Sequence, residues 1–127
     1  GVCRFEPATD RVVEWLHAID VFVLPSLSEA LSNSLMEAMA CGCCAVASRT
    51  GGKPELIDHE RTGLLFTPGD AAGLAQCLKR LAGDSGLRQR LAGAGAAFIQ
   101  KFSLQASVRR MEQIYAGFLL RRDKRSA

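Results

Sequence analysis

A short apolar run that leads directly into a helical pattern is the feature that most constrains the fold of this chain. The run Val21-Phe22-Val23-Leu24 is closed by Pro25, which is typical of a buried parallel strand. Further on, Leu35 and Met39 fit one face of a helix that ends at Gly42, a favoured residue just past a helix C-terminus. The stretch therefore predicts a junction between a strand and a helix.

The same alternation of strands and helices continues on both sides of this junction. We expect strands at 2–5, 21–24, 45–48 and 63–66, with the first pairing with the second. A helix precedes residue 21, and Pro54 begins a short helix after a glycine turn at 50–53. This order predicts an α/β fold with a doubly wound parallel sheet, in which ligands bind beyond the carboxyl ends of the strands.

Beyond residue 70 the chain is predicted to be helical. Asp70 is a natural N-cap for the first of three helices, and a break at 83–86 separates it from the second. Gly93 and Gly95 weaken the second helix by roughly 1 kcal/mol each relative to alanine unless close packing needs them. The apolar faces that we expect to be buried are Leu74, Cys77, Leu78 and Leu81 in the first helix, and Leu87, Leu91, Ala94 and Phe98 in the second.

The last helix, capped by Ser103, carries an apolar stripe that is longer than the local core requires. We expect part of this face to be exposed and to allow self-association. Its members are Leu104, Val108, Met111, Tyr115, Phe118 and Leu119.

Two carboxylates, Glu29 and Glu37, flank the start of the helix that follows Pro25. The free N–H groups of Asn33, Ser34 and Leu35 suit a diphosphate there, because they carry the positive end of the helix dipole. The carboxylates then face the two ends of a bound sugar nucleotide. Alternatively, 26–29 and 34–37 each match the S-x-x-E capping box, so that both glutamates only start helices. Spacing alone favours this alternative.

Charge and cysteine content exclude several classes of protein. The formal net charge of +3 lies entirely in 121–127, a basic tail that suits at most a weak contact with an anionic membrane surface. No basic stripe for nucleic acid is visible. Five cysteines, three of them in the C-x-C-C run at 41–44, do not match a zinc or redox motif and are expected to be reduced core residues.

No apolar run reaches the roughly 18 residues that span a bilayer, and no secretory signal is visible, so we expect a cytoplasmic protein, at most peripheral to the inner membrane. The two histidines, His17 and His59, have no nucleophile placed beside them and are not expected to be catalytic.

The run from Ile19 to Glu55 resembles the donor-binding signature of retaining glycosyltransferases of the family-four type, which have the two-domain GT-B fold. The matching features are I-D-V-F-V-L-P-S, two glutamates with seven residues between them, E-A-M-A-C-G, a small-residue strand and G-G-K-P-E, in this order. The similarity continues through T-G-L-L-F at 62–66 to Phe102-Ser103 and covers nearly the whole chain. Glycines are usual in the family where this chain has Ala30 and Ser32, and proline where it has Cys44.

The resemblance also implies a role for each residue of the signature. Glu29 lies near the donor sugar and diphosphate as the catalytic residue, and Glu37 binds the ribose hydroxyls. The helix start holds the phosphates, and a glycine loop lies beside the donor. The donor-binding residues implied in this way are Ser32, Asn33, Ser34, Leu35, Glu37, Gly51 and Gly52.

The resemblance further implies that residues 1–120 are an incomplete C-terminal donor-binding domain, truncated at its N-terminus. The basic Arg and Lys pair and the acceptor domain of such enzymes are not present, so we expect the enzyme to be the longer protein and this piece to be inactive. From the same resemblance we expect the donor to be a nucleoside diphosphate of a hexose-type sugar, with no metal or cofactor; the base, the sugar and the acceptor are not specified.

Two other functions stay open. One is a non-catalytic binding or assembly module of the same fold that docks a partner through the last helix. The other is a sugar-nucleotide epimerase or hydrolase on a similar frame.

Overall fold

Three parallel strands form the centre of the molecule, in the order β1–β2–β3. The computed structural model describes the backbone of residues 3–123 and the side chains of residues 3–118. The strands are β1 (Val21–Leu24), β2 (Cys44–Ser48) and β3 (Leu64–Phe66), with Val21 opposite Cys44 and Val46 opposite Leu64. The predicted α/β class and parallel sheet are confirmed.

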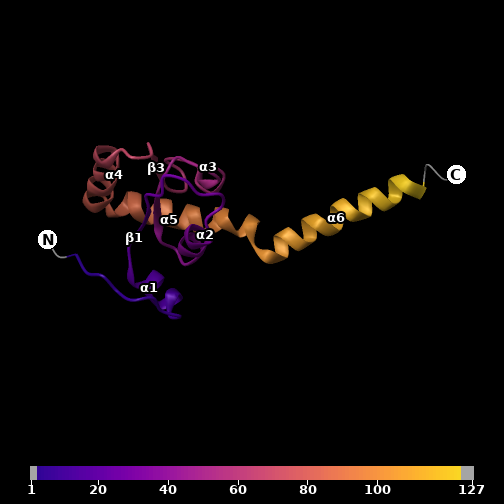
Figure 1. Ribbon diagram of the computed structural model, residues 1–127, viewed down its shortest axis with the longest axis horizontal. Coiled ribbons are helices and arrows are strands. Elements are labelled where there is room, and N and C mark those ends of the chain that lie inside the picture. The colour runs from indigo at the N-terminus through magenta and orange to yellow at the C-terminus, as the bar shows by residue number, and fades with distance from the viewer. Residues whose placement is uncertain (1–2, 124–127) are drawn as a thin grey trace.

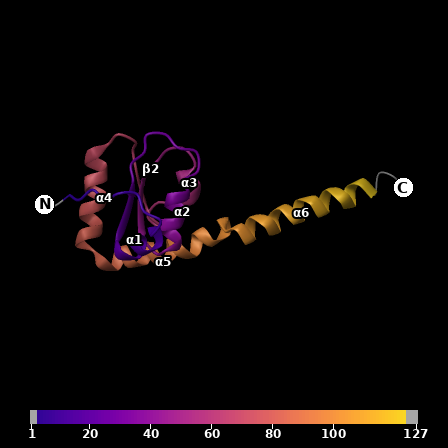
Figure 2. The ribbon, with the colours of Figure 1, turned by 60° about the horizontal axis from the view of Figure 1, so that its bottom comes forward.

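Helices cover both faces of this sheet and meet a separate core on each. Cys44 and Val46 of β2 belong to one apolar cluster, whereas Ala45 and Ala47 belong to the other, as the alternation along a strand requires. Figure 2 shows α2 and α3 on one side of the sheet and α4 on the other, with α5 running across its end. The helices are α1 (Val12–Ala18), α2 (Asn33–Ala40), α3 (Lys53–Leu56), α4 (Ala71–Gly83), α5 (Ser85–Ile99), the short 3-10 helix η1 (Gln100–Phe102) and α6 (Leu104–Asp123).

The predicted helix caps are present. Asp70 accepts a hydrogen bond from the N–H of Gly73 at 2.9 Å, which begins α4. Ser103 accepts from the N–H of Ala106 at 3.2 Å and begins α6. Gly42, at a φ of 83°, closes α2 in the left-handed conformation that glycine adopts most easily.

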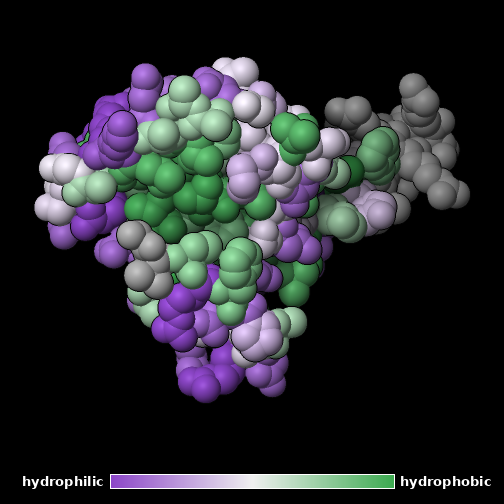
Figure 3. Space-filling model, turned by 60° about the vertical axis from the view of Figure 1, so that its left-hand side comes forward, coloured by the Kyte–Doolittle hydropathy of each residue, from purple (hydrophilic) through white to green (hydrophobic). Residues whose placement is uncertain are grey.

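The predicted first strand is wrong for the described residues 3–5, which have no regular structure. Phe5 is 95% exposed and so has no packing that would hold a strand. β1 is consequently an edge strand, half-buried rather than buried. Figure 3 shows a broad apolar area on this side of the molecule. The half-buried side chains that pack against the core there include Val21, Val23, Leu74 and Cys77.

The buried face of α5 differs by one residue from the predicted one. Leu87 and Leu91 are buried as expected, but the next buried positions are Gly95 and Ile99 rather than Ala94 and Phe98. A side-chain carbon at Gly95 would lie 2.7 Å from the carbonyl oxygen of Thr62. The absence of a side chain therefore brings this part of α5 close to the sheet, and its buried face turns accordingly.

The apolar stripe of α6 is exposed, as predicted. Figure 1 shows α6 projecting away from the rest of the molecule. Leu104 is 76% exposed and Phe118 65%, with Val108, Met111 and Tyr115 between them also exposed. Leu119 of the predicted stripe and the side chains of the basic tail lie outside the described residues. Among the helices of residues 3–123, none combines the length and the hydropathy that crossing a membrane requires.

All five cysteines are unpaired. Cys43 and Cys44 are buried core residues, as predicted, whereas Cys41 is half-buried. The Cys43 thiol donates to the carbonyl of Leu16 at 3.1 Å, which links the residue before β2 to α1. Burial raises the pKa of the Cys44 thiol to about 11.

Candidate functional site

Two loops meet where β1 and β2 end, and their backbones touch. The N–H of Gly52 donates to the carbonyl of Ala30 at 2.6 Å. A side-chain carbon at Gly51 would lie 1.5 Å from the carbonyl oxygen of Glu29, and one at Gly52 would lie 2.5 Å from that of Ala30. Gly51 also has a φ of 57°. Only glycines fit these two positions, so the predicted Glu29 and the predicted glycine loop are brought together.

Glu29 is half-buried in the first of these loops. Its Oε2 accepts a hydrogen bond from the hydroxyl of Ser26 at 3.0 Å. No helix begins at Ser26, because α2 starts only at Asn33. The capping-box alternative for 26–29 is therefore wrong, since this carboxylate has no helix start to cap.

The start of α2 is capped by Ser32. The second capping-box alternative required Ser34 as the cap, so it is wrong. The Oγ of Ser32 accepts from the N–H of Leu35 at 3.3 Å and lies 3.0 Å from the Oγ of Ser34. The Ser32 carbonyl accepts from Met36, one turn on. Within the described part of the chain, the N–H groups of Asn33 and Ser34 have no backbone or side-chain acceptor, and both residues are exposed.

The remaining predicted donor residues divide between the surface and the core. The N–H of Leu35 was predicted to be free for the diphosphate, but it donates to the Ser32 hydroxyl, so this part of the prediction is wrong. Leu35 is fully buried and Ser32 is 1% exposed, so neither side chain reaches the surface. Glu37 is exposed, and with Asn33 it lies on the rim of an open groove of about 270 Å³. The groove runs between α2 and η1, and its apolar lining includes Met36, Ile99 and Phe102.

One residue of this region was not predicted: the fully buried Lys53, the first residue of α3. Its Nζ donates to the carbonyl of Ser26 at 3.0 Å and to the hydroxyl of Ser48 at 2.7 Å. Burial lowers the pKa of Lys53, and the nearby carboxylate of Glu29 acts in the opposite direction. The sequence signal that was available is a lysine directly after the two glycines of the loop.

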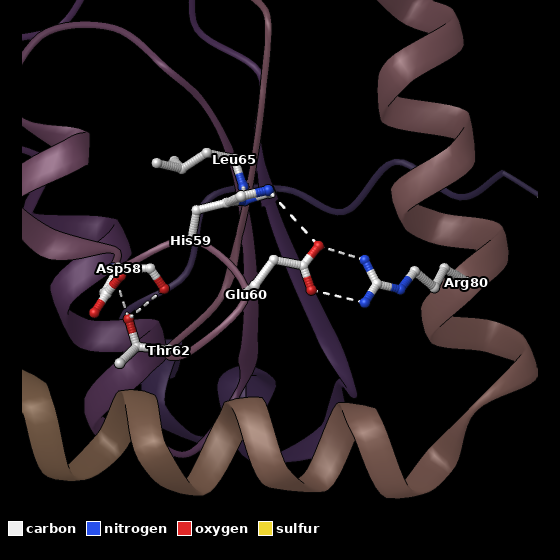
Figure 4. Close-up of polar contacts among 6 residues, drawn as sticks. All are labelled: Asp58, His59, Glu60, Thr62, Leu65 and Arg80. Atoms are coloured by element: carbon white, nitrogen blue, oxygen red, sulfur yellow. Dashed lines mark hydrogen bonds and ion pairs between the residues drawn. The ribbon is translucent and has the colours of Figure 1, made fainter.

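A second polar cluster, at 58–65, joins the loop before β3 to β3 itself and to α4 (Figure 4). The Nδ1 of His59 accepts a hydrogen bond from the N–H of Leu65 at 2.9 Å. This nitrogen therefore holds the loop of His59 against β3. The carboxylate of Glu60 forms a two-point ion pair with Arg80 of α4, one of its contacts being 2.7 Å long. Arg80 thereby lowers the pKa of Glu60. Throughout residues 3–123, no three His, Cys, Asp or Glu side chains gather as they would around a metal ion.

Comparison with known proteins adds an independent view of this arrangement. Residues 2–84 match the family model described as glycosyl transferases group 1. The chain is 32% identical over 117 residues to a D-inositol 3-phosphate glycosyltransferase of Streptomyces bingchenggensis, which covers 91% of this chain and 26% of that relative. The chain thus spans about a quarter of the length of the curated relatives that it matches.

Solved structures show the same similarity. Sucrose-phosphate synthase from Thermosynechococcus elongatus superposes with a TM-score of 0.76 at 34% identity, over 84% of this chain and 27% of that one. Anabaena HepE, solved in complex with UDP-glucose, superposes with a TM-score of 0.77 at 26% identity, over 84% of this chain and 30% of that one.

Proposed function

Because the chain belongs to the family of group 1 glycosyl transferases, we propose that it forms the donor-binding part of a retaining glycosyltransferase. The longer enzyme transfers a hexose-type sugar from a nucleoside diphosphate sugar to an acceptor, without a metal or cofactor. This chain alone binds the donor without transferring the sugar, since it spans about a quarter of its relatives. A cytoplasmic location belongs to the same proposal and is supported by the five unpaired cysteines.

The observation that carries the proposal is the meeting of three elements at one edge of the sheet. The glycine loop after β2 touches the backbone of Glu29 and Ala30. Three residues further on, α2 begins with two N–H groups, those of Asn33 and Ser34, that have no acceptor among the described residues. Such N–H groups suit the oxygens of a diphosphate.

We assign a role to each residue from its position. The N–H groups of Asn33 and Ser34 bind the diphosphate and stabilise the charge that develops on it as the sugar leaves. Glu29 orients the donor sugar, and Glu37 accepts hydrogen bonds from the ribose hydroxyls. Ser32 and Leu35 act indirectly: the first caps α2 and the second anchors it in the core.

Amide NMR spectra of the 127-residue chain, titrated with UDP, GDP and ADP, test this assignment. The amide signals of Asn33, Ser34, Gly51 and Gly52 are expected to shift with one of these nucleotides. Glu37→Ala should weaken that binding about tenfold, because a carboxylate that accepts two hydroxyl hydrogen bonds is lost. Glu112→Ala, on the exposed α6, is the matched control and should change nothing. Nucleotide binding that bypasses these amides, or no binding at all, would sink the assignment.

A second candidate function is the docking of a partner through α6. It is favoured by the exposed apolar stripe, whose members follow a spacing of four and three residues along the helix. Sedimentation equilibrium of the chain tests it with a second copy as the partner. Tyr115→Lys should then abolish a concentration-dependent dimer that Gln113→Lys, away from the stripe, leaves intact. A monomer at every concentration would argue against self-association.

A further inference from the structure

Lys53 is a charged residue buried where the fold has no evident need for a charge. Its side chain is completely shielded from solvent, between the end of β2 and the loop that carries Glu29. Burying an ammonium group is unfavourable unless an opposite charge or strong hydrogen bonds compensate it. Lysine is also among the residues that are least often fully buried. A compensating feature is therefore expected nearby.

The hydrogen bonds of Lys53 do not supply that compensation. Both acceptors are neutral: the carbonyl of Ser26 and the hydroxyl of Ser48. These two groups are also bonded to each other, because the Ser48 hydroxyl donates to the Ser26 carbonyl at 2.6 Å. Without the amine, each would keep a partner. The hydrogen-bond network is therefore satisfied by the two serines alone.

A nearby carboxylate offsets part of the cost of burying Lys53. The carboxylate of Glu29 acts on Lys53 through space, but its hydrogen-bond partner is the hydroxyl of Ser26. A single carboxylate without a direct contact compensates this charge only in part.

A diphosphate at the candidate site would place negative charge near Lys53. Lys53 follows Gly51 and Gly52 directly in the chain, and its Nζ contacts the loop of Glu29 at the Ser26 carbonyl. The same loop leads into α2, whose first two N–H groups have no acceptor among the described residues. On the basis of the proposed function, we propose that Lys53 is a positioning residue whose buried charge favours the diphosphate of the donor without touching it. The charge of Lys53 is also opposite in sign to that of Glu29. The buried cation therefore attracts both the carboxylate of the loop and the diphosphate.

Lys53→Met removes the charge and keeps the length of the side chain. In the 127-residue chain, the affinity for the best-bound of UDP, GDP and ADP is expected to fall about tenfold. The affinity for the corresponding monophosphate should fall less, since it carries less charge. The thermal midpoint without ligand should stay within about 2 °C of wild type or rise, because a buried charge is replaced by an apolar group.

Two control variants test whether the buried charge itself is responsible. Lys79→Met removes an exposed positive charge of α4, away from the candidate site, and should leave affinity within about twofold. Lys53→Arg keeps the charge, and in a folded chain should retain more affinity for the diphosphate than Lys53→Met does.

Several results for Lys53→Met would overturn the inference. Equal diphosphate affinity in Lys53→Met and wild type overturns the inference alone, as does an equal loss for mono- and diphosphate. A Lys53→Met chain that does not fold also overturns it, because the amine would then be needed for the fold itself. If wild type binds none of the three diphosphates, the proposed function fails, and the inference with it.

Discussion

The helices α5 and α6 show how little an apolar pattern determines burial. α5 carries Gly93 and Gly95 and a short apolar face, yet Leu91 is fully buried at the centre of the molecule. α6 projects from the body (Figure 1) and has the longer and more regular apolar stripe, yet the described side chains of that stripe are exposed. The difference lies in the neighbours: α5 packs against both α2 and the sheet, whereas α6 leaves the body after its first turn. A helix is buried where its backbone can approach a partner.

The most damaging change should be Leu91→Ala in α5. It removes a fully buried side chain from the cluster around β2 and is expected to cost about 3 kcal/mol of unfolding free energy. The matched change in α6, Met111→Ala, should stay within about 0.5 kcal/mol, since Met111 is 54% exposed. Urea denaturation of both variants measures the contrast. Similar costs in the two helices would break the comparison.

The two glycines of α5 provide a finer contrast within one helix. Gly95→Ala places a methyl group 2.7 Å from the Thr62 carbonyl and is expected to cost about 2 kcal/mol. Gly93→Ala meets nothing within 4 Å and should stabilise the chain by about 0.5 to 1 kcal/mol. Thermal melts of both variants should shift in opposite directions. A shift of both midpoints in the same direction would show that the close contact between Gly95 and the Thr62 carbonyl does not stabilise the packing of α5.

An exposed ion pair should matter less than either glycine. Arg80 lowers the pKa of Glu60, so the folded state favours the ionised carboxylate. This stability is present above the unfolded pKa, near 4.5, and is lost as the pH falls through the lower folded value. Arg80→Gln should therefore lower the melting midpoint by roughly 2 °C at most at pH 7, because solvent screens the pair. The difference from wild type should vanish in acid; a difference that persists there would refute the ion-pair explanation.

The smallest effect is expected from removing most of α6. A chain that ends at Arg110 keeps the Ser103 cap and the packing of Phe102 against the core. Its unfolding free energy should match that of the full chain within about 0.5 kcal/mol, since the large apolar side chains described between residues 111 and 118 are exposed. A larger loss that depends on protein concentration would instead reveal that α6 is packed against a second copy.

Much of this fold could be predicted from the sequence, because local signals agreed with the tertiary structure. The apolar run at 21–24, the Asp70 and Ser103 caps and the Gly42 stop each have a local physical cause. The buried face of α5 could not be predicted, because Gly95 is buried through its lack of a side chain, which lets the backbone of α5 approach the carbonyl of Thr62. The strand predicted at the N-terminus failed for residues 3–5, since a strand depends on a partner that its own residues do not specify.

The candidate site was predicted in its outline and not in its interior. The glycine pair and Glu29 come together as expected, since both follow strand ends. The burial of Lys53 and its contacts to Ser26 and Ser48 are long-range features, and residue type argues against them. The sequence also could not show whether Ser32 or Ser34 caps α2, because the choice depends on where the chain turns and not on which residues it contains.

The buried thiols of Cys43 and Cys44 allow the opening of the sheet to be measured by chemical modification. With a pKa of about 11, Cys44 has roughly one thiolate in ten thousand molecules at pH 7, and burial shields it from reagents as well. An alkylating reagent at neutral pH therefore modifies the exposed Cys3 at once and reaches Cys44 only when β2 separates from its neighbours. The ratio of the two modification rates, read by mass spectrometry, reports how often the sheet comes apart.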